Sequence, residues 1–277
     1  MFFRTDLALE LLENAPEIPN GVTFREEICD DISVAHTKIE DDEGALHIGK
    51  PIGDYITVTT PTPFPDTLEN ILAEQIKRIL PSESSYFLVL GLGNREVTPD
   101  ALGPTTTEMI PATRHIDSSL AEKIGLANLK KVGVLSPGVL SQTGIETYEI
   151  LKAVAESTKP DAVIVIDALA ARSIKRLGNT IQISNTGITP GAGVGNTRKE
   201  ISQNTLGVPV ISIGVPTVVD AATLVYDLTQ KKGDNGSLIV TPTEIDTIIY
   251  DLSRLLGRAV TKAIQGENVS EILYELV

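Results

Sequence analysis

Two aspartates each follow an apolar run and open the same tripeptide, Asp-Ala-Leu. Asp167 comes directly after the β-branched residues 163–166, and Asp100 follows the apolar residues 86–90 after a short polar stretch. A continuous run of this kind is typical of a parallel strand buried on both faces, and open α/β sheets bind ligands at the carboxyl ends of their strands. Asp is also a preferred N-cap residue, so Asp167 could simply cap a helix that begins at the next residue.

Two carboxylates that meet at the edge of a sheet have the chemistry for peptide hydrolysis. At a separation of about 3 Å they do not ionise together, so the pair holds one proton. The ionised partner would deprotonate a water molecule while the protonated partner polarises the scissile carbonyl. We expect Asp100 and Asp167 to form such a pair, and two independent helix caps remain the alternative. Asp220, a third acid beyond a strand, is expected inside a helix and ranks lower.

Nucleophilic side chains have weaker support in the sequence. A serine hydrolase needs a base beside its serine and often a Gly-x-Ser-x-Gly turn, which this chain lacks. The single cysteine, Cys29, has two acidic neighbours that disfavour a reactive thiolate. We therefore expect no serine or cysteine mechanism.

Metal and phosphate binding are also disfavoured. The three histidines, His36, His47 and His115, show no metal-ligand spacing, and we place the first two in N-terminal strands. The glycine-rich segment 185–199, which contains Gly193, departs from the dinucleotide-binding fingerprint and suits an irregular active-site loop. We expect neither a metal nor another cofactor.

Strands and helices alternate along most of the chain, which predicts an α/β fold with a mostly parallel, twisted sheet and helices on both faces. A helix is expected to begin near Asp66, and a long final helix near Thr241. The other expected strands lie near 86–90, 131–135, 162–166, 180–184 and 208–213, and the other helices near 102–113, 144–157, 168–177 and 217–229.

Residues 1–65 differ from the remainder, and we expect them to form an N-terminal appendage. A short helix near 7–12 precedes two extended stretches, which are separated by the turn-like EDDEG and favour antiparallel strands at the edge of the main sheet. Residues 66–277 would form the core. We therefore predict one α/β domain that spans residues 1–277.

The composition limits the possible partners and location. The chain has 277 residues, 23 Lys and Arg, 37 Asp and Glu, and a formal net charge of -14. This balance argues against a nucleic-acid or anionic-membrane surface, because both need clustered basic residues. We find neither a membrane-spanning run nor a secretory signal. One cysteine suits a reducing compartment, so we expect a cytoplasmic protein.

Seven stretches carry a more specific signal: RTDLALE (4–10), GLGNREVTPDALGP (91–104), TRH (113–115), LSPGVLSQTGIET (135–147), KPDAVIVIDALAARS (159–173), TIQISNTGITPGAGVGNTRKEIS (180–202) and GVPVISIGVPTVVDA (207–221). Together they resemble the germination protease family of spore-forming bacteria. The resemblance implies a phosphorylase/hydrolase-like α/β fold and an atypical aspartic endopeptidase, related to hydrogenase-maturation proteases, with catalytic aspartates at Asp100 and Asp167.

Several other residues in or beside these motifs are candidates for substrate binding or for support of the aspartates. They are Asn94, Glu146, Arg172, Gly193 and Arg198. Arg172 would lie one helical turn after Asp167, where it would orient a carboxylate or contact substrate. The basic residues would also help an acidic protein to bind the acidic peptides that the resemblance implies.

The resemblance also implies partners and regulation. Its substrates would be small acid-soluble spore proteins degraded in the spore core at germination, and the enzyme would be a homotetramer made as a zymogen. Only three residues precede Arg4 here, and the chain lacks a long insertion common before the VTP motif at 240–242. Two alternatives stay open: a metal-dependent maturation-type endopeptidase, which would need a downstream histidine, and a non-proteolytic sporulation protein of the same fold.

Overall fold

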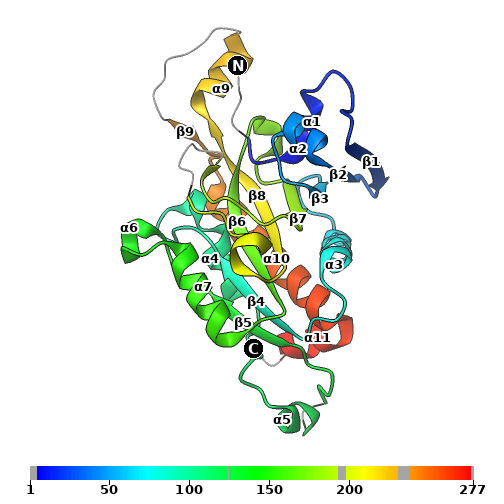
Figure 1. Cartoon of the computed structure of the whole chain (residues 1–277), viewed down its shortest axis with the longest axis vertical. Coiled ribbons are helices and arrows are strands. Elements are labelled where there is room, and N and C mark those ends of the chain that lie inside the picture. Colours follow the sequence, from blue (N-terminus) through cyan, green and yellow to red (C-terminus); the bar gives the residue numbers. More distant parts are fainter. Residues whose placement is uncertain (1–4, 124, 193–197, 230–237, 276–277) are drawn as a thin grey trace.

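The computed structural model describes residues 5–123, 125–192, 198–229 and 238–275 (Figure 1). Its elements in chain order are α1 (Ala8–Glu13), β1 (Val22–Cys29), β2 (Ile32–Ile39), α2 (Asp42–Ile48), β3 (Gly53–Thr59), α3 (Leu68–Ile79), β4 (Tyr86–Gly91), the 3-10 turn η1 (Thr98–Asp100), α4 (Leu102–Glu108), α5 (Ser118–Lys123), β5 (Lys131–Leu135), α6 (Leu140–Thr143), α7 (Thr147–Thr158), β6 (Ala162–Ala171), the 3-10 turn η2 (Ile174–Arg176), β7 (Thr180–Ser184), α8 (Gln203–Leu206), β8 (Val210–Asp220), α9 (Ala221–Thr229), β9 (Ile239–Val240), α10 (Ile245–Gln265) and α11 (Glu267–Glu275).

The described strands form one mixed sheet in the order β1-β2-β3-β7-β8-β6-β4-β5, and β9 pairs with the end of β8. The neighbours β8, β6, β4 and β5 are parallel, as expected for the centre of an α/β fold. The predicted N-terminal strands pair antiparallel at the opposite edge, at the upper right of Figure 1. The antiparallel part is larger than expected, because β7 also runs against β8.

Helices cover both faces of the sheet, which confirms the α/β layering predicted from the alternating pattern. Ile164 and Ile166 of β6 belong to the cluster that contains the buried faces of α3 and α10. Val163 and Val165 belong to the opposite cluster, with Leu151 of α7. Burial on both faces explains the continuous apolar run, and each such side chain contributes roughly 1.5–3 kcal/mol.

The helix predicted over 168–177 is wrong, because β6 continues through Ala171. Residues 168–171 pair with β8, and a register shift follows Leu169. Ala and Leu are strong helix formers in isolation, but here their backbone groups complete a central strand, and the side chains of residues 169–171 are buried. Asp167 therefore lies inside a strand and does not cap a helix.

Other boundaries differ for similar reasons. β8 extends to Asp220, so the helix expected from 217 begins at Ala221 as α9, and the Asp220 carboxylate accepts hydrogen bonds from the N–H groups of Ala222 and Thr223. The EDDEG segment opens α2, with Asp41 as its N-cap, and His47 lies in that helix instead of a strand. The helices expected near 102–113 and 144–157 are present as α4 and α7 with shifted ends. Among the described residues, no helix is long and apolar enough to cross a bilayer.

The N-terminus of α4 packs directly onto the end of β4 and the middle of β6. After Gly91, which pairs with Ile166, the N–H of Leu92 donates to the Ile166 carbonyl at 2.8 Å, and β4 ends while β6 continues. A Cβ atom on Gly103 would lie 2.3 Å from the Leu92 oxygen and 2.5 Å from the Ile166 oxygen. Because Gly103 has no side chain, the backbone of α4 can approach the backbone of both strands. This close approach places η1, and with it Asp100, beside the part of β6 that extends beyond the end of β4.

We expect Gly103→Ala to lower the free energy of unfolding by about 2–3 kcal/mol, because the added methyl group must displace two backbone carbonyls. Chemical denaturation would measure the loss. Gly133→Ala is the matched control, since its Cβ would meet the Tyr86 hydroxyl at 3.1 Å, where a side chain can move. If the two variants were equally stable, this result would contradict the close packing of α4 against β4 and β6.

Candidate active site

Asp167 is a buried carboxyl group within a central strand. Asp167 pairs with Gly214 of β8, and only 6% of its surface is exposed. Its Oδ1 accepts a hydrogen bond of 2.9 Å from the Ala168 N–H. Burial raises the pKa of Asp167 well above its ordinary value, and the negative charges of Asp100 and Asp6 raise it further. Asp167 therefore retains its proton at pH values where most aspartates are ionised.

Asp100 reaches the same place from the end of η1. Its Oδ2 accepts a hydrogen bond of 2.7 Å from the Asn94 N–H, and the loop can pass this close because Gly93 has φ 116 and no side chain. Burial raises the pKa of Asp100, while the Asn94 N–H and the Arg198 guanidinium oppose this increase. Hydrogen bonding and a nearby cation thus favour the ionised form of Asp100 more than that of Asp167.

Both aspartates line one pocket of about 430 Å³. The pocket lies where β4 ends beside β6, which is the carboxyl edge of the parallel strands and the place predicted for a carboxylate pair. Groups that repel one another this way titrate as a coupled pair with separated apparent pKa values. The surroundings therefore favour the proton on Asp167 over Asp100.

Three of the predicted supporting residues come together around Asp100. Arg198 lines the aspartate pocket, and its guanidinium lies 3.8 Å from the Glu146 carboxylate at the start of α7. Asn94 binds Asp100 through its backbone, while its side-chain oxygen accepts from Gln142 at 2.7 Å. Their positions match the sequence expectation, and their roles in catalysis stay predictions.

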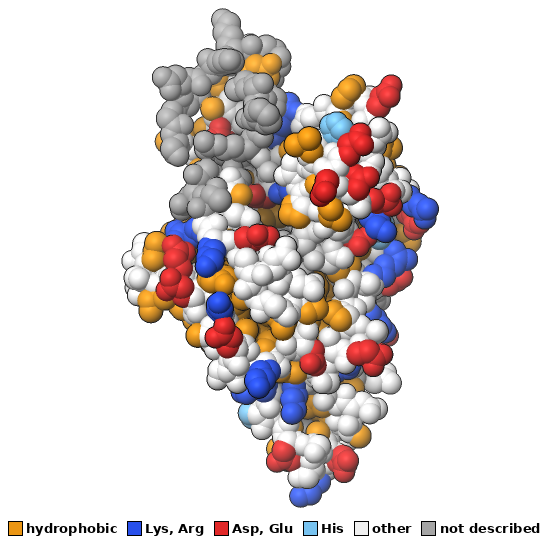
Figure 2. Space-filling view, in the orientation of Figure 1, with side chains coloured by type: hydrophobic (Ala, Val, Ile, Leu, Met, Phe, Trp, Pro, Cys, Tyr) orange, Lys and Arg blue, Asp and Glu red, His pale blue; other side chains and the backbone are white. Residues whose placement is uncertain are grey.

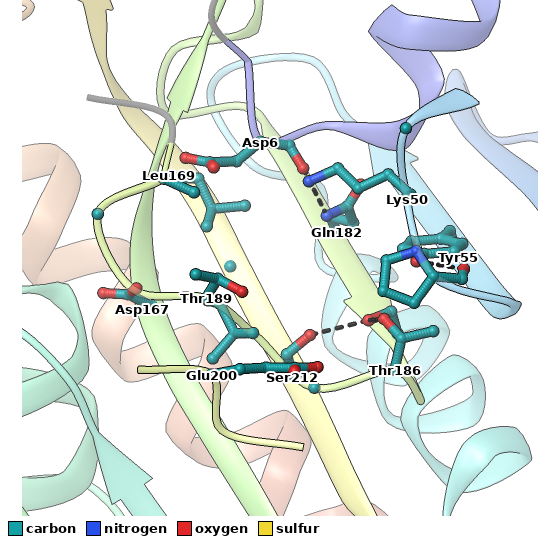
Figure 3. A pocket seen from close by; sticks show the side chains of 18 residues that line it. Asp6, Lys50, Tyr55, Asp167, Leu169, Gln182, Thr186, Thr189, Glu200 and Ser212 are labelled. Carbon is teal, nitrogen blue, oxygen red and sulfur yellow. Dashed lines mark hydrogen bonds between the residues drawn. The ribbon is translucent and has the colours of Figure 1, made fainter. Parts of the chain in front are cut away.

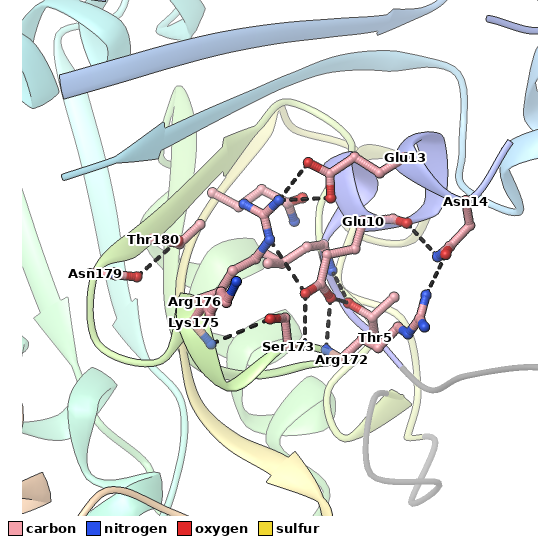
Figure 4. A network of polar contacts seen from close by, with 12 residues as sticks. Thr5, Glu10, Glu13, Asn14, Arg172, Ser173, Lys175, Arg176, Asn179 and Thr180 are labelled. Atoms are coloured by element: carbon pink, nitrogen blue, oxygen red, sulfur yellow. Dashed lines mark hydrogen bonds and ion pairs between the residues drawn. The ribbon is translucent and has the colours of Figure 1, made fainter. Parts of the chain in front are cut away.

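Arg172 is not placed as predicted. Because β6 continues as a strand, Arg172 does not lie one helical turn after Asp167, and it does not line the aspartate pocket. Its guanidinium donates to the Asn14 side chain, and its N–H donates to Glu10 at 2.7 Å (Figure 4). Arg176 also pairs with Glu10, at 3.4 Å. Arg172 thus belongs to a polar network that ties α1 to the end of β6.

Gly193 lies outside the described residues, so its predicted role has no structural counterpart here. The neighbouring part of the same loop does reach the site. Both Pro190 and Gly191 line the aspartate pocket. The described ends of the glycine-rich segment therefore lie at the expected location.

A third acid, Asp6, was missed as a site residue. It lines the aspartate pocket and also a second pocket of about 220 Å³, which shares Asp167 and Leu169 with the first (Figure 3). Lys50 lines this second pocket, where burial lowers the pKa of its ammonium group and the charge of Asp6 opposes that effect. The RTDLALE motif was the signal for Asp6, but local sequence suggested only a helix start there. No sequence pattern pointed to Lys50.

The histidines take no part in this arrangement. His36 lies in β2 and His47 in α2, and burial lowers the pKa of His36. The described part of the chain contains no group of three His, Cys, Asp or Glu side chains arranged to hold a metal ion. The residues present therefore do not fit the metal of a maturation-type protease, and metal-independent catalysis stays a prediction.

The raised pKa of Asp167 predicts a pH-dependent cost in stability. Between about pH 4, where the unfolded chain loses this proton, and the higher folded pKa, the folded protein binds more protons, so its stability falls as pH rises. Asp167→Asn removes the titrating group and can still accept from Ala168. We expect its melting temperature to exceed the parent's by roughly 2–4 °C near neutral pH and to converge with it below about pH 4, as measured by calorimetry.

Asp161→Asn is a control of opposite sign. Asp161 accepts hydrogen bonds from the N–H groups of Ser85 and Tyr86, which lower its pKa, so this variant should lose stability near neutral pH and regain parity in acid. A decrease in the melting temperature of Asp167→Asn near neutral pH would contradict the raised pKa of Asp167.

Comparison with known proteins relates this chain to peptidases. The sequence profile of the germination protease family matches residues 8–232. The germination protease of Caldanaerobacter subterraneus subsp. tengcongensis is 42% identical over an alignment of 308 positions, which covers 95% of this chain and 94% of that protein. The germination protease of Clostridium tetani is 40% identical over an alignment of 312 positions, which covers 96% of each.

Among solved structures, the [NiFe] hydrogenase maturation protease HycI from Thermococcus kodakarensis aligns with a TM-score of 0.39 and 18% identity, covering 67% of this chain and 98% of that one. This similarity is too low to carry a functional assignment. The sequence matches, in contrast, extend over nearly the whole chain. The protein is therefore a peptidase, a hydrolase that acts on peptide bonds, and it belongs to the germination protease family.

Proposed function

We propose that this peptidase is an aspartic-type endopeptidase in which Asp100 and Asp167 activate a water molecule. The supporting observation is that the two carboxyl groups line one pocket in different surroundings, Asp100 beside an N–H donor and a guanidinium, and Asp167 buried within β6. Carboxyl groups whose environments separate their pKa values supply a general base and a general acid at one site.

The reaction follows from these protonation states. Ionised Asp100 accepts a proton from water as the water oxygen bonds to the scissile carbonyl carbon, and Asp167 donates its proton to the carbonyl oxygen. When the tetrahedral intermediate collapses, Asp100 returns its proton to the leaving nitrogen and Asp167 recovers a proton from the intermediate's hydroxyl group. The C–N bond breaks, and both carboxyl groups regain their starting states.

We propose small acid-soluble spore proteins as the substrates, cleaved in the spore core at germination by a homotetramer made as a zymogen. An acidic substrate must approach a chain with a net charge of -14, and Figure 2 shows acidic side chains gathered at the upper right, where Figure 1 places the N-terminal strands. Arg198 brings a positive charge to the aspartate pocket itself. This charge would favour a carboxylate of the substrate beside Asp100.

Both aspartates are expected to be essential for cleavage. We expect Asp100→Asn and Asp167→Asn each to reduce the rate of cleavage of a purified small acid-soluble spore protein by about 10³-fold, because each removes one half of the acid-base chemistry. Fragment formation followed by gel electrophoresis and mass spectrometry measures this loss.

Asp246→Asn, a change of the same type at an exposed position on α10, should cleave like the parent. Circular dichroism confirms that all three variants fold. Full activity in either pocket variant would exclude the carboxylate pair. No cleavage by the parent under any condition would favour a non-proteolytic sporulation protein.

Cleavage is expected to persist after prolonged treatment with EDTA and gel filtration, because the proposed steps need only carboxyl groups and water. The rate before and after treatment should agree within about twofold, with thermolysin as a zinc-dependent control that loses activity. Loss of cleavage that added zinc or nickel restores would instead support the metal-dependent alternative.

A further inference from the structure

We propose that Asp6 is a positioning residue that keeps the proton of the carboxylate pair on Asp167 and so assigns the base to Asp100. This inference rests on the proposed function for its catalytic meaning. The effect of the Asp6 carboxylate on the protonation of Asp167 can be measured without any peptidase assay.

The N-terminal segment is fixed against β6 immediately beyond Asp167. The Asp6 N–H donates to the Ala170 carbonyl at 2.9 Å, and the Ala170 N–H donates to the Asp6 carboxylate at 2.9 Å. Asp6 thus binds the backbone of Ala170 through both its main chain and its side chain. Ala170 is three residues from Asp167 on the same strand, so the position of the Asp6 charge relative to Asp167 is set by backbone contacts.

Gln182 of β7 holds the same segment from its other side. Its side-chain nitrogen donates to the Asp6 carbonyl at 3.1 Å, and its side-chain oxygen accepts from the Ala8 N–H at 2.7 Å. Between them, Leu7 is fully buried against Leu169. These contacts hold the segment in one conformation. The Asp6 carboxylate therefore stays at a constant distance from Asp167.

The place where Asp6 is held is common to both pockets. Asp6 and Asp167 line the aspartate pocket together with Asp100, and both also line the second pocket. Figure 3 shows Asp6 further along β6 than Asp167, with Lys50 beside it. Asp167 therefore shares the aspartate pocket with two other carboxyl groups, Asp100 from η1 and Asp6 from the N-terminal segment.

The surrounding charges make the effect asymmetric. Arg198 favours the anion of Asp100, while Asp167 is opposed by both Asp100 and Asp6. Lys50 faces Asp6 and offsets part of its charge, and Glu200 lines the second pocket as another acid. Burial of Asp167 and the donors beside Asp100 already favour the proton on Asp167. A third negative charge on the Asp167 side strengthens that preference.

The test uses Asp6→Asn, which removes the charge while its side-chain oxygen still accepts from Ala170. The protonation of Asp167 is followed by ¹³C NMR of aspartate-labelled full-length protein, with its signal assigned through Asp167→Asn. We expect the Asp167 titration in Asp6→Asn to move to lower pH by about one unit, because a like charge has been removed. The alkaline limb of the kcat profile should move down equally, with KM little changed.

Glu13→Gln is the matched control. It removes a negative charge from the same N-terminal region, but Glu13 is an exposed residue of α1 that pairs with Arg176 and lines neither pocket. Its Asp167 titration should equal that of the parent. If Asp6→Asn fails to fold, Lys50→Met is the second variant, and removal of that cation should move the Asp167 titration to higher pH.

An unchanged Asp167 titration in folded Asp6→Asn overturns the proposal. So does a raised KM with an unmoved pH profile, which would assign Asp6 to substrate binding, or a uniform loss of kcat at every pH, which would assign it to structure alone. The two proposals can also fail separately. If the Asp167 titration shifts in Asp6→Asn but the parent protein cleaves no substrate, the effect of Asp6 is supported and the proposed function is not.

Discussion

The burial of a carboxyl group within a central strand is the constraint on which the rest of this structure depends. Asp167 lies on β6, where it pairs with Gly214 of β8 and is 6% exposed, so an ionised group there loses most of its hydration. An unpaired buried charge costs several kcal/mol, so the group either keeps its proton or gains compensating donors. The surroundings of Asp167 favour the first solution, because burial and the neighbouring carboxylates raise its pKa.

The surroundings of the second aspartate, Asp100, differ from those of Asp167. Asp100 stands on a 3-10 turn that reaches the sheet because Gly93 and Gly103 let backbone approach backbone. There it gains a direct N–H donor from Asn94 and the field of Arg198. The same sheet edge thus holds two chemically identical side chains in contrasting surroundings.

The N-terminal residues, which look like an appendage in sequence, take part in this arrangement. Asp6 pairs with Ala170 beyond Asp167, and buried Glu10 accepts hydrogen bonds from the N–H groups of Arg172 and Ser173. The end of β6 and the residues that follow it are therefore bound by the N-terminal segment, which lies more than 160 residues away in the chain. Folding of that segment and assembly of the site are consequently coupled.

The sequence by itself determined the α/β class and predicted that Asp100 and Asp167 follow strands that end at one edge of the sheet, because apolar runs and strand ends follow from local pattern. Only the tertiary structure decided that Asp167 lies inside a strand, that Arg172 binds Asn14, and that Asp6 and Lys50 line a pocket with Asp167. Residues 168–171 have helix-forming composition, and what overrides it is pairing with β8 and the burial of residues 169–171. Pairing partners are distant in sequence, so no local pattern could have revealed them.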